Sequence, residues 1–170
     1  EHIEMLQEIE PEWVAFSFVN SAEYIKRGKQ LLASYVTSRR QPKVVAKIET
    51  PKGVANIEKI LPEIDIVLVA RGDLGLTAPI ERLGFMQKRL VKAAKKAGKE
   101  VIVSTQILDS IVHNFIPARS DVLDLTNIVL DGADGIMLAK ETGISLTPGR
   151  SVSMAQKIVD AVLTEAELSS

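Results

Sequence analysis

Short apolar runs alternate along the chain with longer amphipathic segments. The runs are rich in β-branched residues and predict strands at 13–18, 43–48, 64–70, 100–105 and 134–139. Between them, apolar positions recur with helical spacing and predict helices at about 21–37, 53–62, 80–97, 107–131 and 148–166. The fourth of these should break at Pro117, and residues 5–10 have the pattern of a helix tail before the first strand. Strands that alternate with helices and are apolar on both faces predict a parallel sheet covered by helices.

Two architectures fit this order of elements: an open, doubly wound sheet and part of an eight-stranded barrel. No GxGxxG turn follows the first strand, which disfavours the dinucleotide-binding form of the open sheet. The 170 residues have the length of a single domain, and no shift in composition separates the five strand–helix units.

Composition narrows the class of protein further. Hydrophobic residues make up 46% and charged residues 25%, which is ordinary globular usage. A net charge of -1 gives no sign of a nucleic-acid partner, and the absence of cysteine excludes disulfides and thiolate metal sites. No apolar stretch reaches transmembrane length and no signal peptide opens the chain, so we expect a cytoplasmic protein without a membrane partner.

Polar residues with chemical capacity follow every predicted strand. In both architectures the active site lies at the carboxyl ends of the strands, so these residues are the candidates for a site. In chain order they are Ser17, Lys47 with Glu49, Arg71 with Gly72 and Asp73, Thr105 with Gln106, and Lys140 with Glu141 and Thr142.

The stretch "VVAKIETPKG" places Lys47 and Glu49 two residues apart at a strand end. Residues two apart on a strand point to the same face, so the two side chains should converge. One interpretation is an ordinary solvated ion pair. The other joins Glu49 with Asp73 as hard oxygen ligands for Mg²⁺, beside a lysine that neutralises a phosphate or an oxyanion. The glycines of "RGDLG" would let the backbone approach a ligand, although an ordinary turn explains them equally well.

Five stretches together resemble the pyruvate kinase family. They are "WVAFSFVNSAE", "VVAKIETPKGV", "DIVLVARGDLGL", "PIERLGFMQKRLVKAAKKAGKEVIVSTQIL" and "NIVLDGADGIMLAKET", and their order and spacing agree over essentially the whole chain. The resemblance implies Mg²⁺-dependent phosphoryl transfer from phosphoenolpyruvate to ADP, giving pyruvate and ATP in glycolysis. Ser17 matches a serine near the family's substrate.

The resemblance also implies roles for the other candidate residues. Lys47 corresponds to the catalytic lysine, which stabilises the phosphoryl group. Glu49 and Asp73 correspond to the ligands of Mg²⁺ or Mn²⁺. Backbone amides around Gly72 and Asp73, with Thr105, would receive the carboxylate of phosphoenolpyruvate, and the enolpyruvate would be protonated near Thr105.

The sequence departs from the family pattern at several positions near these motifs. Thr77 stands where a glutamate is expected, Ala118 replaces a threonine, and Lys52 replaces an acidic or polar residue. Ala139 and Lys140 replace a serine and a glycine. These departures bear on regulation and nucleotide handling, whereas the lysine and the two metal carboxylates are retained.

By resemblance, residues 1–170 hold strands four to eight of a (β/α)₈ barrel, without the first three strands, the lid domain or the carboxy-terminal domain. Any potassium requirement would rest on residues that this sequence lacks. We expect either a fragment or a reduced relative, with open sheet edges and an inner face that exposes Val, Ile and Leu side chains. Such a chain should form homo-oligomers or pair with a complementary barrel fragment, and should be inactive alone. A non-catalytic assembly module and a metal-dependent lyase for a pyruvate-like substrate are the alternatives.

Overall fold

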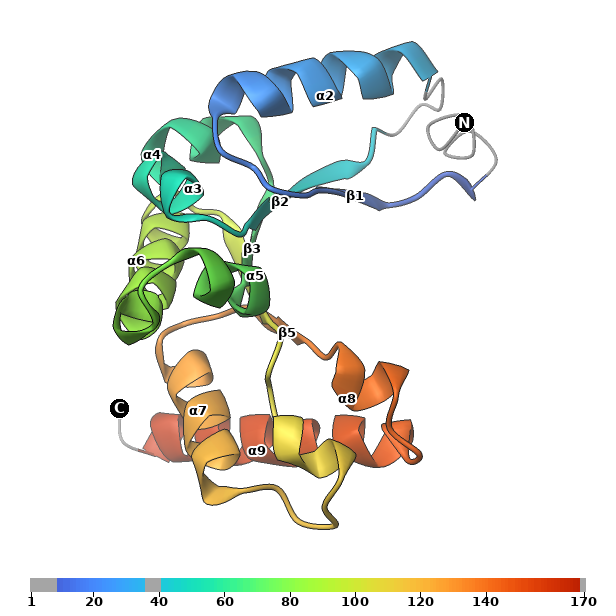
Figure 1. Ribbon diagram of the computed structural model, residues 1–170, viewed down its shortest axis with the longest axis vertical. Helices are drawn as coiled ribbons and strands as arrows, with labels where there is room; N and C mark the ends of the chain where they lie inside the picture. Colours follow the sequence, from blue (N-terminus) through green and yellow to red (C-terminus); the bar gives the residue numbers. More distant parts are fainter. Residues whose placement is uncertain (1–8, 36–40, 169–170) are drawn as a thin grey trace. The chain divides into compact units, whose positions relative to one another are not determined.

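The computed structural model describes residues 9–35 and 41–168, in which five strands form one sheet in sequence order (Figure 1). The strands are β1 (Trp13–Phe16), β2 (Lys43–Ile48), β3 (Ile66–Ala70), β4 (Glu100–Ser104) and β5 (Gly135–Met137). The pairs β1–β2, β2–β3 and β4–β5 are parallel. The predicted α/β class with a parallel sheet is therefore confirmed. The chain divides into two compact units, residues 1–101 and 102–170.

The register in the first unit aligns the ends of its strands. Trp13 lies opposite Lys43 on the pair β1–β2, and Val45 lies opposite Ile66 on the pair β2–β3. Because the strands are parallel, the residues that follow β1, β2 and β3 emerge at the same edge of the sheet. This is the edge at which the first candidate residues were expected.

Helices of the first unit begin and end where local chemistry favours it. They are α2 (Ala22–Tyr35), α3 (Pro51–Ala55), α4 (Ile57–Ile60), α5 (Arg71–Thr77) and α6 (Leu83–Lys96), with 3-10 turns η1 (Leu61–Glu63) and η2 (Ile80–Arg82). Thr50 caps α3 and Pro51 opens it, which starts this helix two residues before the predicted position. A basic last turn and Gly98, with φ of +67°, end α6.

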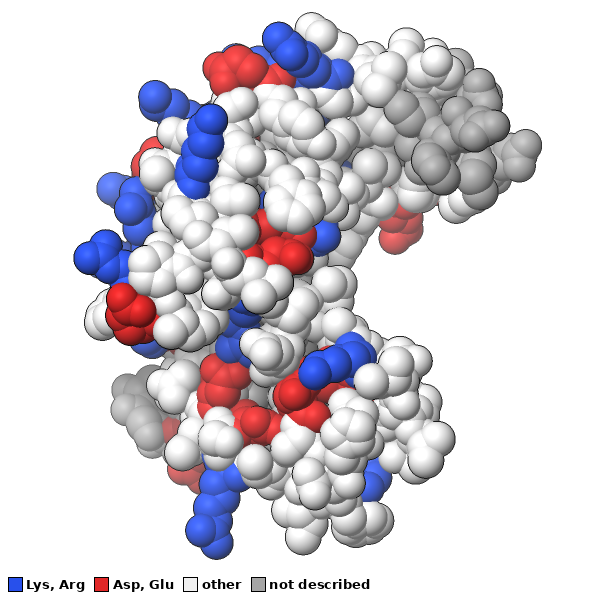
Figure 2. All heavy atoms as spheres, viewed as in Figure 1, with Lys and Arg blue, Asp and Glu red and all other residues white. Residues whose placement is uncertain are grey.

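Helix α6 separates an apolar inner face from a basic outer one. Its buried residues include Leu90, Val91 and Ala94, and the helix packs against β3. Lysine and arginine side chains gather on the outer side, over α4 and α6 (Figure 2). On the inner side of α2, Ile25 is fully buried where that helix packs against α4 and η1. The apolar positions of α2 and α6 that predicted helices are thus the positions that face the core.

The short helix α5 was not predicted. Its sequence, "RGDLGLT", contains two glycines, which lower helix propensity and suggested a turn. Leu74 at its centre is fully buried, so tertiary packing compensates for the weak propensity.

The second unit holds η3 (Asp109–Val112), α7 (Arg119–Leu130), α8 (Lys140–Gly143) and α9 (Pro148–Leu168). Both α7 and α8 pack against α9, around Leu125, Ile128 and Ala155. The predicted break at Pro117 is confirmed, since that residue lies between η3 and α7.

Side-chain exposure on the sheet differs from the expectation. All residues of β3 are buried, as are Val44, Val45, Ala46 and Ile48 of β2. The prediction of an exposed inner face is therefore wrong for these two strands, and exposure concentrates on the edge strands, at Trp13 (48%) and Met137 (40%). Helix α6 packs against β3, whereas β1 and β5 lie at the ends of the strand order.

Two sequence expectations have other outcomes. Most of the helix tail predicted at 5–10 lies outside the described residues. Within the described part of the chain, every helix is too short or too polar to cross a lipid bilayer.

Candidate functional site

Lys47 and Glu49 form an ion pair where β2 ends. The Lys47 Nζ lies 2.8 Å from the Glu49 Oε1, and the exposed fractions of the two side chains are 26% and 1%. The predicted convergence of the two side chains is confirmed, but the interpretation as a solvated surface pair is wrong because the carboxylate is buried. Burying a carboxylate is costly unless it is paired and hydrogen-bonded.

The residues that follow β1 supply further partners for this pair. The backbone N–H of Phe18 donates a hydrogen bond to the Glu49 Oε2, and the Lys47 Nζ donates to the Ser17 Oγ over 3.2 Å. Phe18 has a φ of +51°, a left-handed conformation that costs a bulky residue roughly 1–2 kcal/mol. Its side chain is 53% exposed, so burial of the ring does not repay this cost. The conformation instead directs the N–H at the carboxylate.

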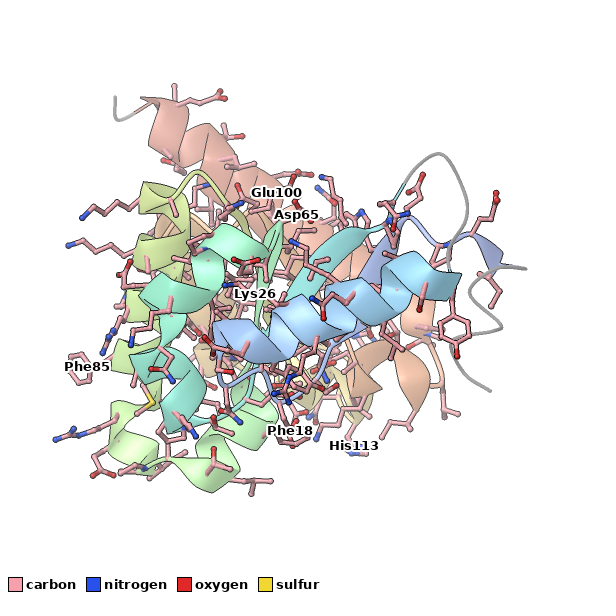
Figure 3. The ribbon with its side chains drawn as sticks, turned by 90° about the horizontal axis from the view of Figure 1, so that it is seen from above. Phe18, Lys26, Asp65, Phe85, Glu100 and His113 are labelled. Atoms are coloured by element: carbon pink, nitrogen blue, oxygen red, sulfur yellow. The ribbon has the colours of Figure 1, made fainter. Side chains whose placement is uncertain are left out.

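Figure 3 separates the two ends of these strands, with Phe18 at one end and Asp65 at the other. At the Asp65 end, the carboxylate accepts a hydrogen bond of 2.8 Å from the Val44 N–H, and Lys43 pairs with Glu100 at 3.0 Å. These contacts connect the starts of the strands. The candidate site residues lie at the opposite end, beside Phe18.

The loop after β1 is attached to the segment after β2. The Val19 N–H donates to the Lys47 carbonyl over 3.2 Å, and the Asn56 side chain donates to the Asn20 carbonyl over 2.8 Å. A Cβ at Gly53 would lie only 2.6 Å from the Val19 carbonyl oxygen, so this close approach requires glycine. The loop that carries Ser17 is therefore held firmly beside the ion pair.

Gly72 and Asp73 lie in the first turn of α5, directly after β3, and are half-buried. Since Ile48 lies opposite Val69, the start of α5 emerges at the edge where Glu49 follows β2. Arg71 is buried and donates to Gln87 of α6 over 3.4 Å, which attaches the start of α5 to that helix. Gly72 and Asp73 therefore belong to the same edge as the ion pair.

The donors at this edge suit a hard divalent cation that is completed by other ligands. No group of three or more His, Cys, Asp or Glu residues forms a metal cage in the part of the chain that is described. Magnesium needs no such cage, because one or two carboxylates with waters and substrate phosphate oxygens complete its shell. The carboxylate oxygens of Glu49 retain lone pairs beyond those used by Lys47 and Phe18, so Glu49 with Asp73 fits this donor set.

Thr105 follows β4 in the second unit. Its Oγ1 donates to the Ser104 carbonyl over 2.6 Å, and its φ is +70°. Gln106 and Leu108 also have positive φ, at +54° and +58°. Such conformations are uncommon for residues other than glycine and are concentrated at functional sites. No feature of the sequence indicates this strained turn.

Ala139 and Lys140, two of the positions that differ from the family pattern, both make polar contacts within the second unit. The Ala139 N–H donates to the Oε2 of the fully buried Glu141 over 2.8 Å. The Lys140 Nζ lies 2.7 Å from the Asp109 Oδ1, which connects α8 to η3. The hydrogen bond to Asp109 raises the pKa of Lys140 above its ordinary value.

Known proteins are similar to this chain in sequence and fold. A family model described as the barrel domain of pyruvate kinase matches residues 2–152. The chain is 40% identical to a pyruvate kinase of Methanocaldococcus jannaschii over 147 residues, which cover 86% of this chain and 32% of that protein. It is 41% identical to a pyruvate kinase of Mycobacterium tuberculosis over 149 residues, which cover 88% and 31%.

A solved structure agrees with these relatives. The crystal structure of a pyruvate kinase from Cryptosporidium parvum superimposes with a TM-score of 0.90 at 31% identity, and the match covers 95% of this chain and 34% of that one. The chain thus spans about a third of the length of the relatives it matches. By the family model and by these relatives, the chain belongs to the pyruvate kinase family, through that family's barrel domain.

Proposed function

We propose that the chain supplies part of the active site for Mg²⁺-dependent phosphoryl transfer from phosphoenolpyruvate to ADP, within a complete barrel. The observation that carries the proposal is the ion pair of Lys47 with the buried Glu49 carboxylate, at the edge where Asp73 follows β3. A lysine, two carboxylates and backbone N–H groups at one edge can bind a phosphate and a metal ion together.

In the proposed reaction, the bond between phosphorus and the enol oxygen breaks, and a bond forms to a terminal oxygen of ADP. Lys47 stabilises negative charge on the moving phosphoryl group, and Ser17 orients its ammonium. By resemblance to the family, the backbone at Gly72 and Asp73 would bind the substrate carboxylate together with Thr105 in a complete barrel. The enolate that is left takes a proton from water at its terminal carbon, near Thr105, which completes pyruvate.

Glu49 and Asp73 would hold Mg²⁺, or Mn²⁺ in its place, and the ion would supply positive charge that offsets the charge of the phosphate. Phe18 keeps the Glu49 carboxylate oriented through its N–H. With this activity the protein would act in glycolysis, in the cytoplasm, with phosphoenolpyruvate and the ADP/ATP pair as its partners.

A chimaera tests the proposal in a complete barrel. Residues 2–152 replace the matched segment of the Methanocaldococcus jannaschii relative, and ATP formation from phosphoenolpyruvate and ADP is measured with Mg²⁺. We expect ATP at a readily measured rate, and a loss of at least about a thousandfold when the chimaera carries Lys47→Met, because the stabilising charge is gone. The control is the same chimaera with Lys92→Met, which makes the same change at an exposed lysine on α6.

Three results separate the candidate functions. ATP formation that depends on Lys47 supports the kinase. A folded chimaera that makes no ATP, and cleaves a pyruvate-like substrate only when Mg²⁺ is added, supports the metal-dependent lyase. A folded chimaera without either activity supports the non-catalytic assembly module. Full activity with Lys47→Met would refute the role of the lysine.

A further inference from the structure

Thr77 connects the two segments that carry the carboxylates. It is the last residue of α5, and its Oγ1 lies 3.0 Å from the carbonyl oxygen of Glu49. The same Oγ1 lies 3.0 Å from the Asp73 carbonyl and 3.3 Å from the Leu74 carbonyl. A hydroxyl has one proton, so it donates to one of these carbonyls at a time.

The two acceptors at 3.0 Å have different consequences for the fold. Threonine in a helix often donates to the carbonyl four residues earlier, and the Asp73 carbonyl is that local acceptor. The Glu49 carbonyl belongs to the segment after β2, 28 residues away in the chain. A bond to this carbonyl therefore joins α5 to the end of β2, which a purely local bond would not do.

We propose that Thr77 is a positioning residue for the divalent cation. Its hydroxyl holds α5 against the Glu49 backbone, and so keeps the carboxylates of Glu49 and Asp73 at the separation that one ion requires. This inference rests on the proposed function, in which these two residues are the metal ligands. Thr77 itself does not contact the ion.

The residue type at this position is decisive. The family pattern has a glutamate here, and an ionised glutamate only accepts hydrogen bonds, so it could not donate to the Glu49 carbonyl. The connection through Thr77 is therefore a feature of this chain's own sequence, and serine is the substitution that should preserve it.

The test measures Mn²⁺ binding to the full 170-residue chain by electron paramagnetic resonance, with Thr77→Val and Thr77→Ser. Valine has the shape of threonine without the hydroxyl. We expect Thr77→Val to bind Mn²⁺ about three- to tenfold more weakly, the range of one lost hydrogen bond. Thr77→Ser should bind within about twofold of the unchanged chain.

Thr164→Val is the matched control, because the Thr164 Oγ1 donates only a local bond of 2.9 Å, to the Asp160 carbonyl four residues earlier on α9. It should leave Mn²⁺ affinity unchanged, while circular dichroism should show equal folding for all variants. If Thr77→Val does not fold, Thr77→Ala gives the same comparison with Thr77→Ser.

The outcomes distinguish this role from the metal site itself. If Asp73→Asn abolishes Mn²⁺ binding but Thr77→Val has no effect, the positioning role is overturned and the site stands. Equal weakening by serine and valine would also overturn it, because packing and not the hydroxyl would then matter. If Mn²⁺ does not bind, or if Glu49→Gln and Asp73→Asn leave binding unchanged, the metal site fails and the role of Thr77 fails with it.

Discussion

Replacing Lys47 by methionine should destabilise the first unit markedly, while replacing Glu49 by glutamine should not. Methionine retains the aliphatic stem of the lysine but removes the ammonium that lies 2.8 Å from the Glu49 carboxylate. The carboxylate is only 1% exposed, so water cannot replace the lost partner without a rearrangement. Among the described contacts, the Phe18 N–H would then be the donor left to Glu49.

The magnitude follows from the geometry. Two charges 2.8 Å apart attract by about 6 kcal/mol at an effective dielectric constant of roughly 20, and desolvation cancels much of this. Removing one partner of a fully buried pair costs about 3–5 kcal/mol. Since the Lys47 side chain is 26% exposed, we expect a smaller loss of about 2–3 kcal/mol in the free energy of unfolding.

Replacing the other partner, Glu49, has a smaller effect on the free energy of unfolding. Glutamine can still accept a hydrogen bond from the Phe18 N–H, and the partly exposed Lys47 can still donate to Ser17 and to water. We therefore expect Glu49→Gln to cost no more than about 1 kcal/mol. The double variant should be close to Glu49→Gln alone, because no unpaired buried charge remains. The double-mutant cycle of Lys47→Met and Glu49→Gln should thus give a coupling free energy of about 2 kcal/mol between the two side chains.

Urea unfolding followed by tryptophan fluorescence measures this cycle. Trp13, the single tryptophan, lies on β1 beside β2 and therefore reports on the first unit. A loss of 2–3 kcal/mol should lower the unfolding midpoint by roughly 1–2 M urea, at a fixed protein concentration. If Lys47→Met is as stable as Glu49→Gln, or if the two effects simply add, the carboxylate does not depend on the lysine and the reasoning is refuted.

Three further predictions concern the stability of two variants and the oligomeric state of the chain. Gly53→Ala should lower stability by about 1–3 kcal/mol in urea unfolding, because its Cβ would lie 2.6 Å from the Val19 carbonyl, whereas Gly84→Ala, which meets nothing within 4 Å, should not. The hydrogen bond to Asp109 raises the pKa of Lys140 above 10.5, so its stabilisation is complete below that pH and is lost as the pH rises further. The melting temperatures of the unchanged chain and of Lys140→Met should therefore differ at pH 9, and the difference should shrink as the pH rises above 10.5. The chain should elute as a dimer or larger species, because β1 and β5 are the edge strands of the sheet among the described residues, and a monodisperse monomer by light scattering would contradict this.

The fold was predictable from sequence where burial is periodic. The run "KVVAKI" was predicted as a strand at 43–48, and β2 has these bounds because its apolar residues are buried on both faces. Helix α5 was missed because its stability comes from tertiary burial, at Leu74 and Arg71, and not from propensity or period. The predicted helix 53–62 is divided into α3 and α4 at Asn56, which ends one helix and begins the next.

The candidate site was predictable only in its side-chain chemistry. The spacing of Lys47 and Glu49 fixes their common face, so their convergence could be read directly from the strand period. The spacing gives no information about the burial of the Glu49 carboxylate. That burial depends on the loop after β1, which contacts the ion pair through Ser17 and Phe18. That loop acts through the backbone N–H of Phe18, and every residue except proline has such a group. A side-chain motif can therefore identify a buried carboxylate's charged partner, but its backbone donors become visible only when the chain is folded.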